Sequence, residues 1–341
     1  MTELPTHLSG ETELEEIMTR PTAELISDLQ SIDGDIMILG VAGKMGLTLA
    51  RMAKRAAPDK RVIGVARFSA PGSREGLEAI GVETVACDLL DRAQIEALEP
   101  VKNVLFMAGR KFGAAQDQPA TWAMNAYVPA LVAERFKDSR IIAFSTACVY
   151  ALSDVEGSGS IEEHALTPPG EYANSCVGRE RMFEYFSAQH RTPGRLFRLC
   201  YAIDMRYGVL HDIATAVWND QPVSLAMSHA NVLWQGDANA IALRLLAHCT
   251  VPSSPINVSG PEKIEIRKVA EEFGRLFGKE VSFTGRPEKS AWLVNTKLQQ
   301  SMFGKPTVGI DQLIGWTADW VQNDRGSLGK PTHFEVRDGT Y

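Results

Sequence analysis

A glycine-rich segment between an apolar run and a helical pattern constrains the fold of this chain more than any other feature. The segment reads Gly-Val-Ala-Gly-Lys-Met-Gly over residues 40–46, after the apolar run 35–39 and before the helical pattern 47–55. Glycines in such a loop allow a tight turn, and they let backbone N–H groups approach a pyrophosphate at the start of the helix. The segment therefore predicts a dinucleotide cradle made by Gly40, Gly43, Lys44, Met45 and Gly46.

The first 200 residues continue as an alternation of apolar runs and helical patterns. Parallel strands need crossover helices of this length, so the alternation predicts a doubly wound, Rossmann-type α/β sheet. The expected strands are Asp35–Leu39, Arg61–Ala66, Thr84–Cys87, Val101–Met107, Arg140–Phe144 and Arg195–Cys200. The expected helices are Leu47–Arg55, Arg74–Ile80, Trp122–Phe136 and one that starts near Tyr172.

Three regions are expected along the chain. Residues 1–34 form an N-terminal extension with a short helix at 21–30, and residues 35–200 form the dinucleotide-binding domain, to which residues 231–250 return. The pattern beyond residue 201 is less regular, so residues 201–230 and 251–341 are assigned to a smaller substrate-binding lobe and a C-terminal arm. In this lobe we expect short strands at 256–258 and 281–284 and a helix at 266–277. Residues 329–335 are expected to cover the cleft or a partner subunit as an extended arm.

The composition excludes several classes of partner. A formal net charge of −7 over 341 residues argues against nucleic acid and anionic membranes, because both attract basic surfaces. No apolar run is long enough to cross a bilayer, and the polar N-terminus does not resemble a signal peptide. The five cysteines show no CxxC pairing, so we expect free thiols, no metal site and a cytoplasmic location.

The end of the second expected strand indicates which cofactor is preferred. An acidic residue there would hydrogen-bond the ribose hydroxyls of NAD, whereas arginine accommodates the 2′-phosphate of NADP. The chain has Ala66-Arg67 and no carboxylate, and Lys44 adds a second positive charge in the glycine loop. These residues favour NADP, with NAD as the alternative if Arg67 is only a solvated loop residue.

Taken together, these motifs resemble the extended short-chain dehydrogenase/reductase superfamily, of the NAD-dependent epimerase/dehydratase type, over residues 35–315. The resemblance implies a Rossmann domain, a small C-terminal substrate lobe and hydride transfer on a sugar-like substrate. The matching positions in this sequence are the GxxGxxG glycines Gly40, Gly43 and Gly46, the adenine-contacting pair Asp88-Leu89, the small pair Ala108-Gly109 beside the cofactor, the helix residue Asn125, the Ser/Thr-rich segment Ser145–Tyr150, and the catalytic Tyr172.

The resemblance assigns the chemistry to Tyr172 and Thr146. A tyrosine phenol can pass a proton to or from the reacting oxygen, and a neighbouring hydroxyl can position that oxygen. Without the family pattern, Thr146 is an ordinary strand residue and Tyr172 an aromatic residue at a helix start.

The family's YxxxK motif is incomplete, because Cys176 stands where the lysine is expected. That lysine lowers the tyrosine pKa by its charge, and a thiol cannot replace it. Arg110, Lys111 and Arg179 are candidates for a nearby cation. The departure leaves an alternative of a different class, a dinucleotide-binding sensor or structural protein without turnover.

The type of reaction is narrowed by the residues after Thr146. Dehydratases of the superfamily place an Asp-Glu pair there, whereas this chain has Ala147-Cys148, which favours oxidation, reduction or 4-epimerisation. The Cys148 segment is also similar to GDP-fucose synthases, which implies a second hypothesis: Cys148 and His211 exchange protons next to a carbonyl. The alternative is a buried cysteine and a surface histidine.

The sequence leaves the substrate open among a sugar, a sugar acid and a nucleotide sugar. The family resemblance implies a homodimer through the helices at 122–136 and 172–190.

Overall fold

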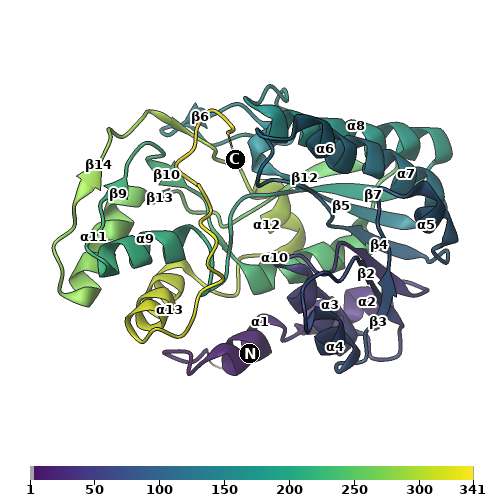
Figure 1. Cartoon of the computed structure of the whole chain (residues 1–341), viewed down its shortest axis with the longest axis horizontal. Coiled ribbons are helices and arrows are strands. Elements are labelled where there is room, and N and C mark those ends of the chain that lie inside the picture. Colours follow the sequence, from purple (N-terminus) through teal and green to yellow (C-terminus); the bar gives the residue numbers. More distant parts are fainter. Residues whose placement is uncertain (1–3, 341) are drawn as a thin grey trace.

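The computed structural model describes residues 4–340 and contains a central sheet of seven parallel strands (Figure 1). Its order is β3-β2-β1-β4-β5-β7-β12. Successive strands are added on one side from β1 to β3 and on the other side from β4 onward, so the strand order reverses between β1 and β4. Ligands of doubly wound sheets bind in the crevice at such a reversal. The strands are β1 (Ile36–Leu39), β2 (Val62–Ala66), β3 (Glu83–Ala86), β4 (Asn103–Phe106), β5 (Arg140–Thr146), β7 (Gly194–Leu199) and β12 (Ser254–Val258).

Helices pack on both faces of this sheet, which explains why β1, β2 and β4 are buried along their whole length. One face is covered by α2 (Ala23–Gln30), α3 (Gly46–Ala56) and α10 (Gln235–Arg244). The other is covered by α5 (Arg92–Ala97), α7 (Val128–Arg135) and α8 (Glu171–His190), and the short α4 (Ser73–Glu78) precedes β3. None of the helices within residues 4–340 is long and apolar enough to span a bilayer.

These elements confirm the predicted α/β fold class. The main difference lies in the helix expected at 122–136. It begins earlier, as α6 (Gln118–Trp122), where Asp117 caps the first turn, and it continues through a π-helical segment, Ala123–Tyr127, before α7. One wide turn does not change the apolar pattern enough to be visible in the sequence, yet it often marks a functional position in a helix.

The smaller lobe packs three helices around its own hydrophobic core. Buried side chains of all three helices meet there, with Trp292 from a neighbouring loop. The lobe helices are α9 (Val209–Trp218), α11 (Ile266–Phe277) and α13 (Ile310–Gln322); α12 (Lys297–Phe303) contacts β12. Short two-stranded pairs join β6 (Ser153–Asp154) to β15 (Ser290–Ala291), β8 (Ala202–Ile203) to β11 (Leu233–Trp234), β9 (Val223–Ser224) to β14 (Phe283–Thr284), and β10 (His229–Ala230) to β13 (Ile264–Glu265).

One strand that the sequence assigned to the lobe belongs elsewhere. The strand expected at 256–258 is β12, which pairs in parallel with β7 and forms an edge of the central sheet. Five consecutive residues of β12 pair with residues 195–199 of β7. A short apolar run carries no information about a partner strand more than fifty residues away, so its sheet could not be read from its pattern.

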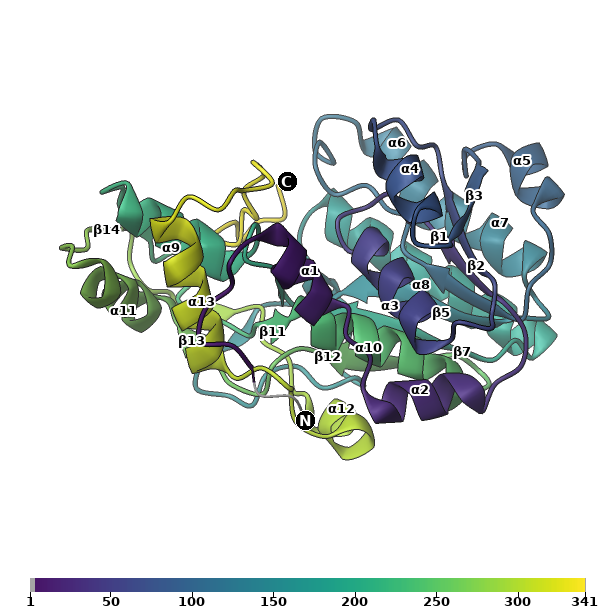
Figure 2. The same cartoon turned by 90° about the horizontal axis from the view of Figure 1, so that it is seen from below.

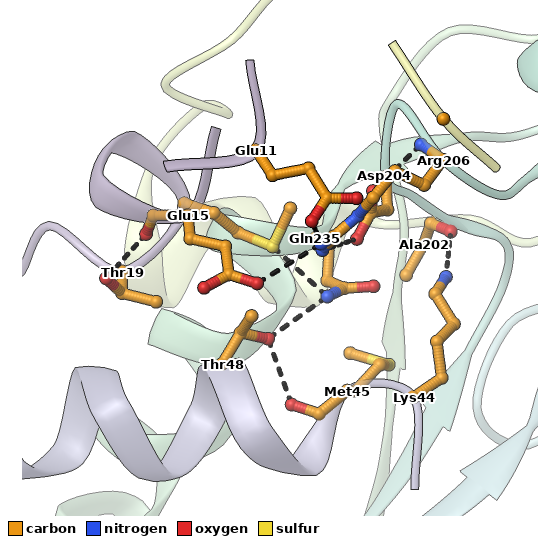
Figure 3. Close-up of polar contacts among 12 residues, drawn as sticks. Glu11, Glu15, Thr19, Lys44, Met45, Thr48, Ala202, Asp204, Arg206 and Gln235 are labelled. Carbon is orange, nitrogen blue, oxygen red and sulfur yellow. Dashed lines mark hydrogen bonds and ion pairs between the residues drawn. The ribbon is translucent and has the colours of Figure 1, made fainter. Parts of the chain in front are cut away.

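The N-terminal segment is an integral part of both halves of the molecule. Helix α1 (Glu11–Met18) buries Leu14 and Met18 in the core of the lobe. On its polar side, Glu15 forms an ion pair with Arg206 of the lobe at 3.1 Å (Figure 3). Glu15 also pairs with Arg51 of α3 at 3.2 Å. Figure 2 shows α1 between α13 and α3. The segment therefore joins the domain of the central sheet to the lobe.

We predict that Leu14→Ala lowers the free energy of unfolding by about 2–5 kcal/mol, the usual cost of truncating a buried leucine. Thr12→Ala, on the exposed side of the same helix, is the control and should change it by less than about 0.5 kcal/mol. Urea unfolding of both variants measures the difference. Equal stability of the two variants would contradict the integration of α1 into the lobe.

Candidate active site

Two adjoining cavities lie at the carboxyl ends of the central strands. One measures about 260 Å³ and the other about 340 Å³. Gly40, Gly43 and Met107 line both of them, so the two cavities form one cleft that passes over the glycine loop. A dinucleotide consists of two nucleotide halves joined by a pyrophosphate, and a two-part cleft bridged by this loop matches that shape.

The glycine loop approaches its neighbours so closely that side chains are excluded. Gly40 has a φ of 90°, and a Cβ atom there would lie 2.7 Å from the backbone nitrogen of Ala108. A Cβ atom at Gly46 would lie 2.2 Å from the carbonyl oxygen of Val41. These contacts bring the end of β1, the start of α3 and the end of β4 together, and the bare loop at the start of α3 fits a pyrophosphate.

The smaller cavity contains most of the residues expected around the adenosine half of the cofactor. Its lining includes Arg67, Asp88, Leu89, Ala108 and Gly109. Arg67 comes directly after β2 and is exposed, and no acidic residue takes the position that would select NAD. The geometry thus brings together the side chains that the sequence proposed for adenosine and ribose.

Lys44 does not extend toward Arg67, contrary to the expectation of a second charge beside a 2′-phosphate. It lines the larger cavity, where its Nζ donates to the carbonyl of Ala202 at 3.3 Å (Figure 3). The same nitrogen lies 4.0 Å from the ring centroid of Tyr207. Met45 lines the same cavity. Burial lowers the pKa of Lys44 to about 8. A side-chain direction of this kind is set by the lobe that closes over the loop and has no signal in the local sequence.

Asn125 is the second expected cofactor residue with a different placement. It is fully buried in the π-helical segment and lines neither cavity. Its Oδ1 accepts hydrogen bonds from the backbone N–H of Arg110 and from Arg179, both at 2.8 Å, and its Nδ2 donates to Ser175. Asn125 therefore supports the loop after β4 from behind and does not face the cleft.

The residues assigned to the chemistry lie together in the larger cavity. Thr146 ends β5, Tyr172 is in the first turn of α8, and Cys148 lies in the short 3-10 turn after β5. The Oγ1 of Thr146 accepts the backbone N–H of Cys148 at 3.2 Å, which orients the threonine hydroxyl at the end of the strand. The cavity thus combines a phenol, a hydroxyl and a thiol beside the glycine loop.

His211, by contrast, does not join this group. It lines a different cavity, formed by α9 and the C-terminal segment, and its Nε2 lies 3.1 Å from the Oγ of Ser327. Cys148 and His211 therefore do not share a cavity, which leaves their paired proton exchange without the geometry it needs. The neighbouring Asp212 lines the same cavity as His211 and accepts hydrogen bonds from the N–H and Oγ1 of Thr332 at 2.8 and 2.5 Å.

The environment of Tyr172 opposes ionisation of its phenol. Burial raises its pKa well above the usual value, and the nearby thiols of Cys176 and Cys148 raise it further. The guanidinium of Arg179 acts in the opposite direction. Burial also raises the pKa of Cys176. Without bound cofactor, the phenol and this thiol are therefore protonated at neutral pH.

The C-terminal arm closes one side of the larger cavity, as one of the two expectations for it proposed. Thr332 lies in the cavity wall, and its carbonyl accepts a hydrogen bond of 3.0 Å from Lys111, which follows β4. Burial lowers the pKa of Lys111. Tyr207 and Trp292 complete the wall and were not expected there, because they come from lobe segments with no recognisable motif.

Two other basic residues form ion pairs with carboxylates of the protein. Arg110 pairs with Asp117 at 3.3 Å, and Arg206 pairs with Asp204 at 2.9 Å as well as with Glu15. No group of three or more potential metal ligands occurs within residues 4–340, and the five cysteines are free thiols.

We predict that Gly40→Ala weakens the binding of NADPH more than about tenfold, because backbone strain of 1–3 kcal/mol at a positive φ adds to the clash with Ala108. The control is Gly76→Ala in α4, where a Cβ atom has nothing within 4 Å. Fluorescence titration with NADPH measures both affinities. Unchanged affinity in Gly40→Ala would show that the loop is not the cofactor cradle.

No family model and no curated protein matches the sequence. Among solved structures, the dTDP-glucose 4,6-dehydratase of Bacillus anthracis in complex with NAD matches with a TM-score of 0.72 and 15% identity, over 85% of this chain and 97% of that chain. A UDP-glucuronic acid 4-epimerase mutant of Bacillus cereus, with NAD bound, matches at 0.70 and 16%, over 85% and 99%. The NAD complex of the Thermus thermophilus UDP-glucose 4-epimerase matches at 0.70 and 18%, over 84% and 99%. The chain therefore has the fold of these epimerases and dehydratases, which confirms the fold that the sequence resemblance implied.

Proposed function

We propose that this protein is an NADP-dependent oxidoreductase or epimerase that acts on a sugar, a sugar acid or a nucleotide sugar. The observation that carries the proposal is the position of Thr146 and Tyr172 in the cavity that continues from the glycine loop. The similar structures, which include a dehydratase and two epimerases named for sugar nucleotides, support it at the level of fold. When bound, the nicotinamide supplies hydride transfer at a hydroxyl or carbonyl carbon.

In this proposal the protein's own side chains donate and accept the proton. The Tyr172 phenol is protonated at neutral pH, so it is ready to donate to the oxygen of a carbonyl that is being reduced. In this proposal the Thr146 hydroxyl, which lines the same cavity as Tyr172, hydrogen-bonds the same oxygen. For oxidation, the reverse reaction, the phenol must first lose its proton, and nearby positive charge favours that loss.

The cofactor that we propose is NADP, and NAD is the alternative. Arg67 supports NADP because it lines the smaller cavity at the position where a 2′-phosphate needs a cation. The bound NAD in the similar structures supports the alternative. The residues that would bind the dinucleotide are the glycine loop together with Arg67, Asp88, Leu89, Ala108 and Gly109.

The lysines of the larger cavity support a substrate with an anionic group. Lys44 projects from the glycine loop and Lys111 from the loop after β4, so cations line the cavity from two sides. Within residues 4–340, Lys44 forms no ion pair with a carboxylate, and its polar partners are a carbonyl and an aromatic ring. A carboxylate or phosphate of the substrate would offset the cost of burying this charge.

The remaining parts of the proposal concern the reaction class, the assembly and the location. Elimination of water lacks an acid and a base after Thr146, since Ala147 and Cys148 follow it.

Exposed Trp122, Tyr127 and Tyr185 lie on the helices of the expected homodimer interface, and aromatic residues are enriched in such interfaces. We also propose a cytoplasmic location, which the free thiols support.

We predict that Tyr172→Phe lowers turnover about 10²–10⁴-fold, the usual contribution of a general acid, and leaves the affinity for NADPH unchanged. Turnover is followed by nicotinamide absorbance with a panel of aldoses, uronic acids and nucleotide sugars. NMR analysis of the sugar detects an internal 4-epimerisation. Tyr185→Phe, at an exposed tyrosine of the same helix, is the control. Tight cofactor binding with no turnover on any substrate would favour the sensor instead.

We predict that Lys44→Met weakens the binding of anionic panel members about tenfold or more, the cost of losing one charged hydrogen bond, and leaves neutral sugars unaffected. Because the pKa of Lys44 is about 8, affinity for anions should fall as the pH rises above that value. Lys268→Met, at an exposed lysine of α11, is the control. A loss of NADPH affinity alone would assign Lys44 to the cofactor and contradict its role toward the substrate.

A further inference from the structure

Helix α8 carries three functional positions on one face. Cys176 and Arg179 follow Tyr172 by four and seven residues, and this spacing places the three side chains on one face of a helix. Cys176, at the position of the missing lysine, is completely buried and carries no positive charge. The next residue on this face, Arg179, does carry one.

Arg179 is buried among neutral groups. Its side chain donates to the carbonyl of Phe144 at 2.7 Å and to the Oδ1 of Asn125 at 2.8 Å, and its guanidinium carbon lies 5.5 Å from the ring centroid of Phe106. Within residues 4–340, no carboxylate lies within ion-pair distance of Arg179, and the adjacent Glu180 is paired with Arg198 at 2.7 Å. An arginine keeps its proton at any physiological pH, so this charge is permanent and expensive to bury.

The guanidinium lies directly behind the wall of the cleft. A Cβ atom at Gly109 would be 2.6 Å from the Nη2 of Arg179, so a larger residue at Gly109 would collide with the guanidinium. Gly109 itself lines the smaller cavity. The chain therefore places an uncompensated positive charge between the cofactor cleft and the start of α8.

We propose that Arg179 is the fixed cation of this site, whose charge favours the phenolate of Tyr172 in place of the missing lysine. This inference rests on the proposed function, in which Tyr172 moves a proton. Arg179 acts through Tyr172 and is a positioning residue. The direction of its effect agrees, since its charge lowers the pKa of both Tyr172 and Cys176.

Several other groups face the phenol from the elements around it. Cys176 contacts it from the next turn of α8, and Cys148 faces it from the turn after β5. Both oppose ionisation when they are thiolates. Lys111, from the loop after β4, and Lys44, from the glycine loop, line the same cavity as the phenol. The variant that removes the charge of Arg179 must therefore leave these side chains unchanged.

The competing explanation is purely structural, because the two hydrogen bonds of Arg179 also tie α8 to β5 and to the π-helical segment. Two substitutions separate charge from anchoring. Arg179→Gln keeps an amide donor without a charge, and Arg179→Lys keeps the charge with fewer donors. In a third variant, Cys176→Lys is added to Arg179→Gln, which returns a cation to the family's usual position.

The experiment reads the ionisation of residue 172 directly in the full-length protein. Tyr172 is replaced by difluorotyrosine, whose more acidic phenol titrates while the protein is folded, and its fluorine NMR signal is followed against pH under reducing conditions. We expect Arg179→Gln to raise the midpoint by about one pH unit, a tenfold change, as for loss of a nearby opposite charge. In Arg179→Lys and in the double variant, the midpoint should return most of the way to its value with arginine at position 179. Arg181→Gln, at an exposed arginine of α8, should leave the midpoint unchanged.

A midpoint that is the same with arginine and with glutamine at position 179 would overturn the inference. So would a shift in Arg179→Gln that neither lysine variant reverses, since that result indicates anchoring alone. Thermal unfolding checks that each variant folds, and Arg179→Met replaces the glutamine variant if that one does not. The titration needs no substrate, so absence of turnover would count against the proposed function without affecting this result.

Discussion

The site depends on the close backbone approaches that occur where three elements meet at the glycine loop. Gly40 and Gly46 let the end of β1, the start of α3 and the end of β4 lie within contact distance. This junction aligns the carboxyl ends of the central strands on one cleft. It also places Ala108 and Gly109 beside the loop, so one constraint shapes the floor of both cavities.

The distribution of charge around the cleft differs from that of the whole protein. The chain has a net charge of −7, yet Lys44 and Lys111 line the cavity that contains Tyr172, and Arg179 lies behind Gly109 in the wall of the adjoining smaller cavity. Two of these cations therefore line the cleft, and the third is buried behind its wall. Cations that line a cavity suit recognition of an anionic group, whereas a cation buried behind the wall acts only through its field. The arrangement thus assigns recognition of an anionic group to two cations and control of the pKa of the Tyr172 phenol to the third.

Local patterns were sufficient to predict the α/β fold of the sheet domain. Strands β1, β2, β4 and β5 are largely apolar runs bounded by turn residues, and the glycine spacing identified the loop without knowledge of its neighbours. Predictions that required distant contacts did less well. The side chain of Lys44 turns toward Ala202, more than 150 residues away, and His211 faces a cavity closed by the C-terminal segment. Likewise, Asn125 was expected at the cofactor, and the π-helical turn buries it behind Gly109.

The most direct test of this account is calorimetric titration of the full-length protein with NADP⁺ and, separately, with NAD⁺. The account predicts one site per chain, with NADP⁺ binding more tightly than NAD⁺ because Arg67 lies where the 2′-phosphate is expected. Tighter binding of NAD⁺ would reverse the cofactor preference and leave the fold-based function intact. No binding of either dinucleotide at millimolar concentration would contradict the central claim that the glycine loop is a dinucleotide cradle.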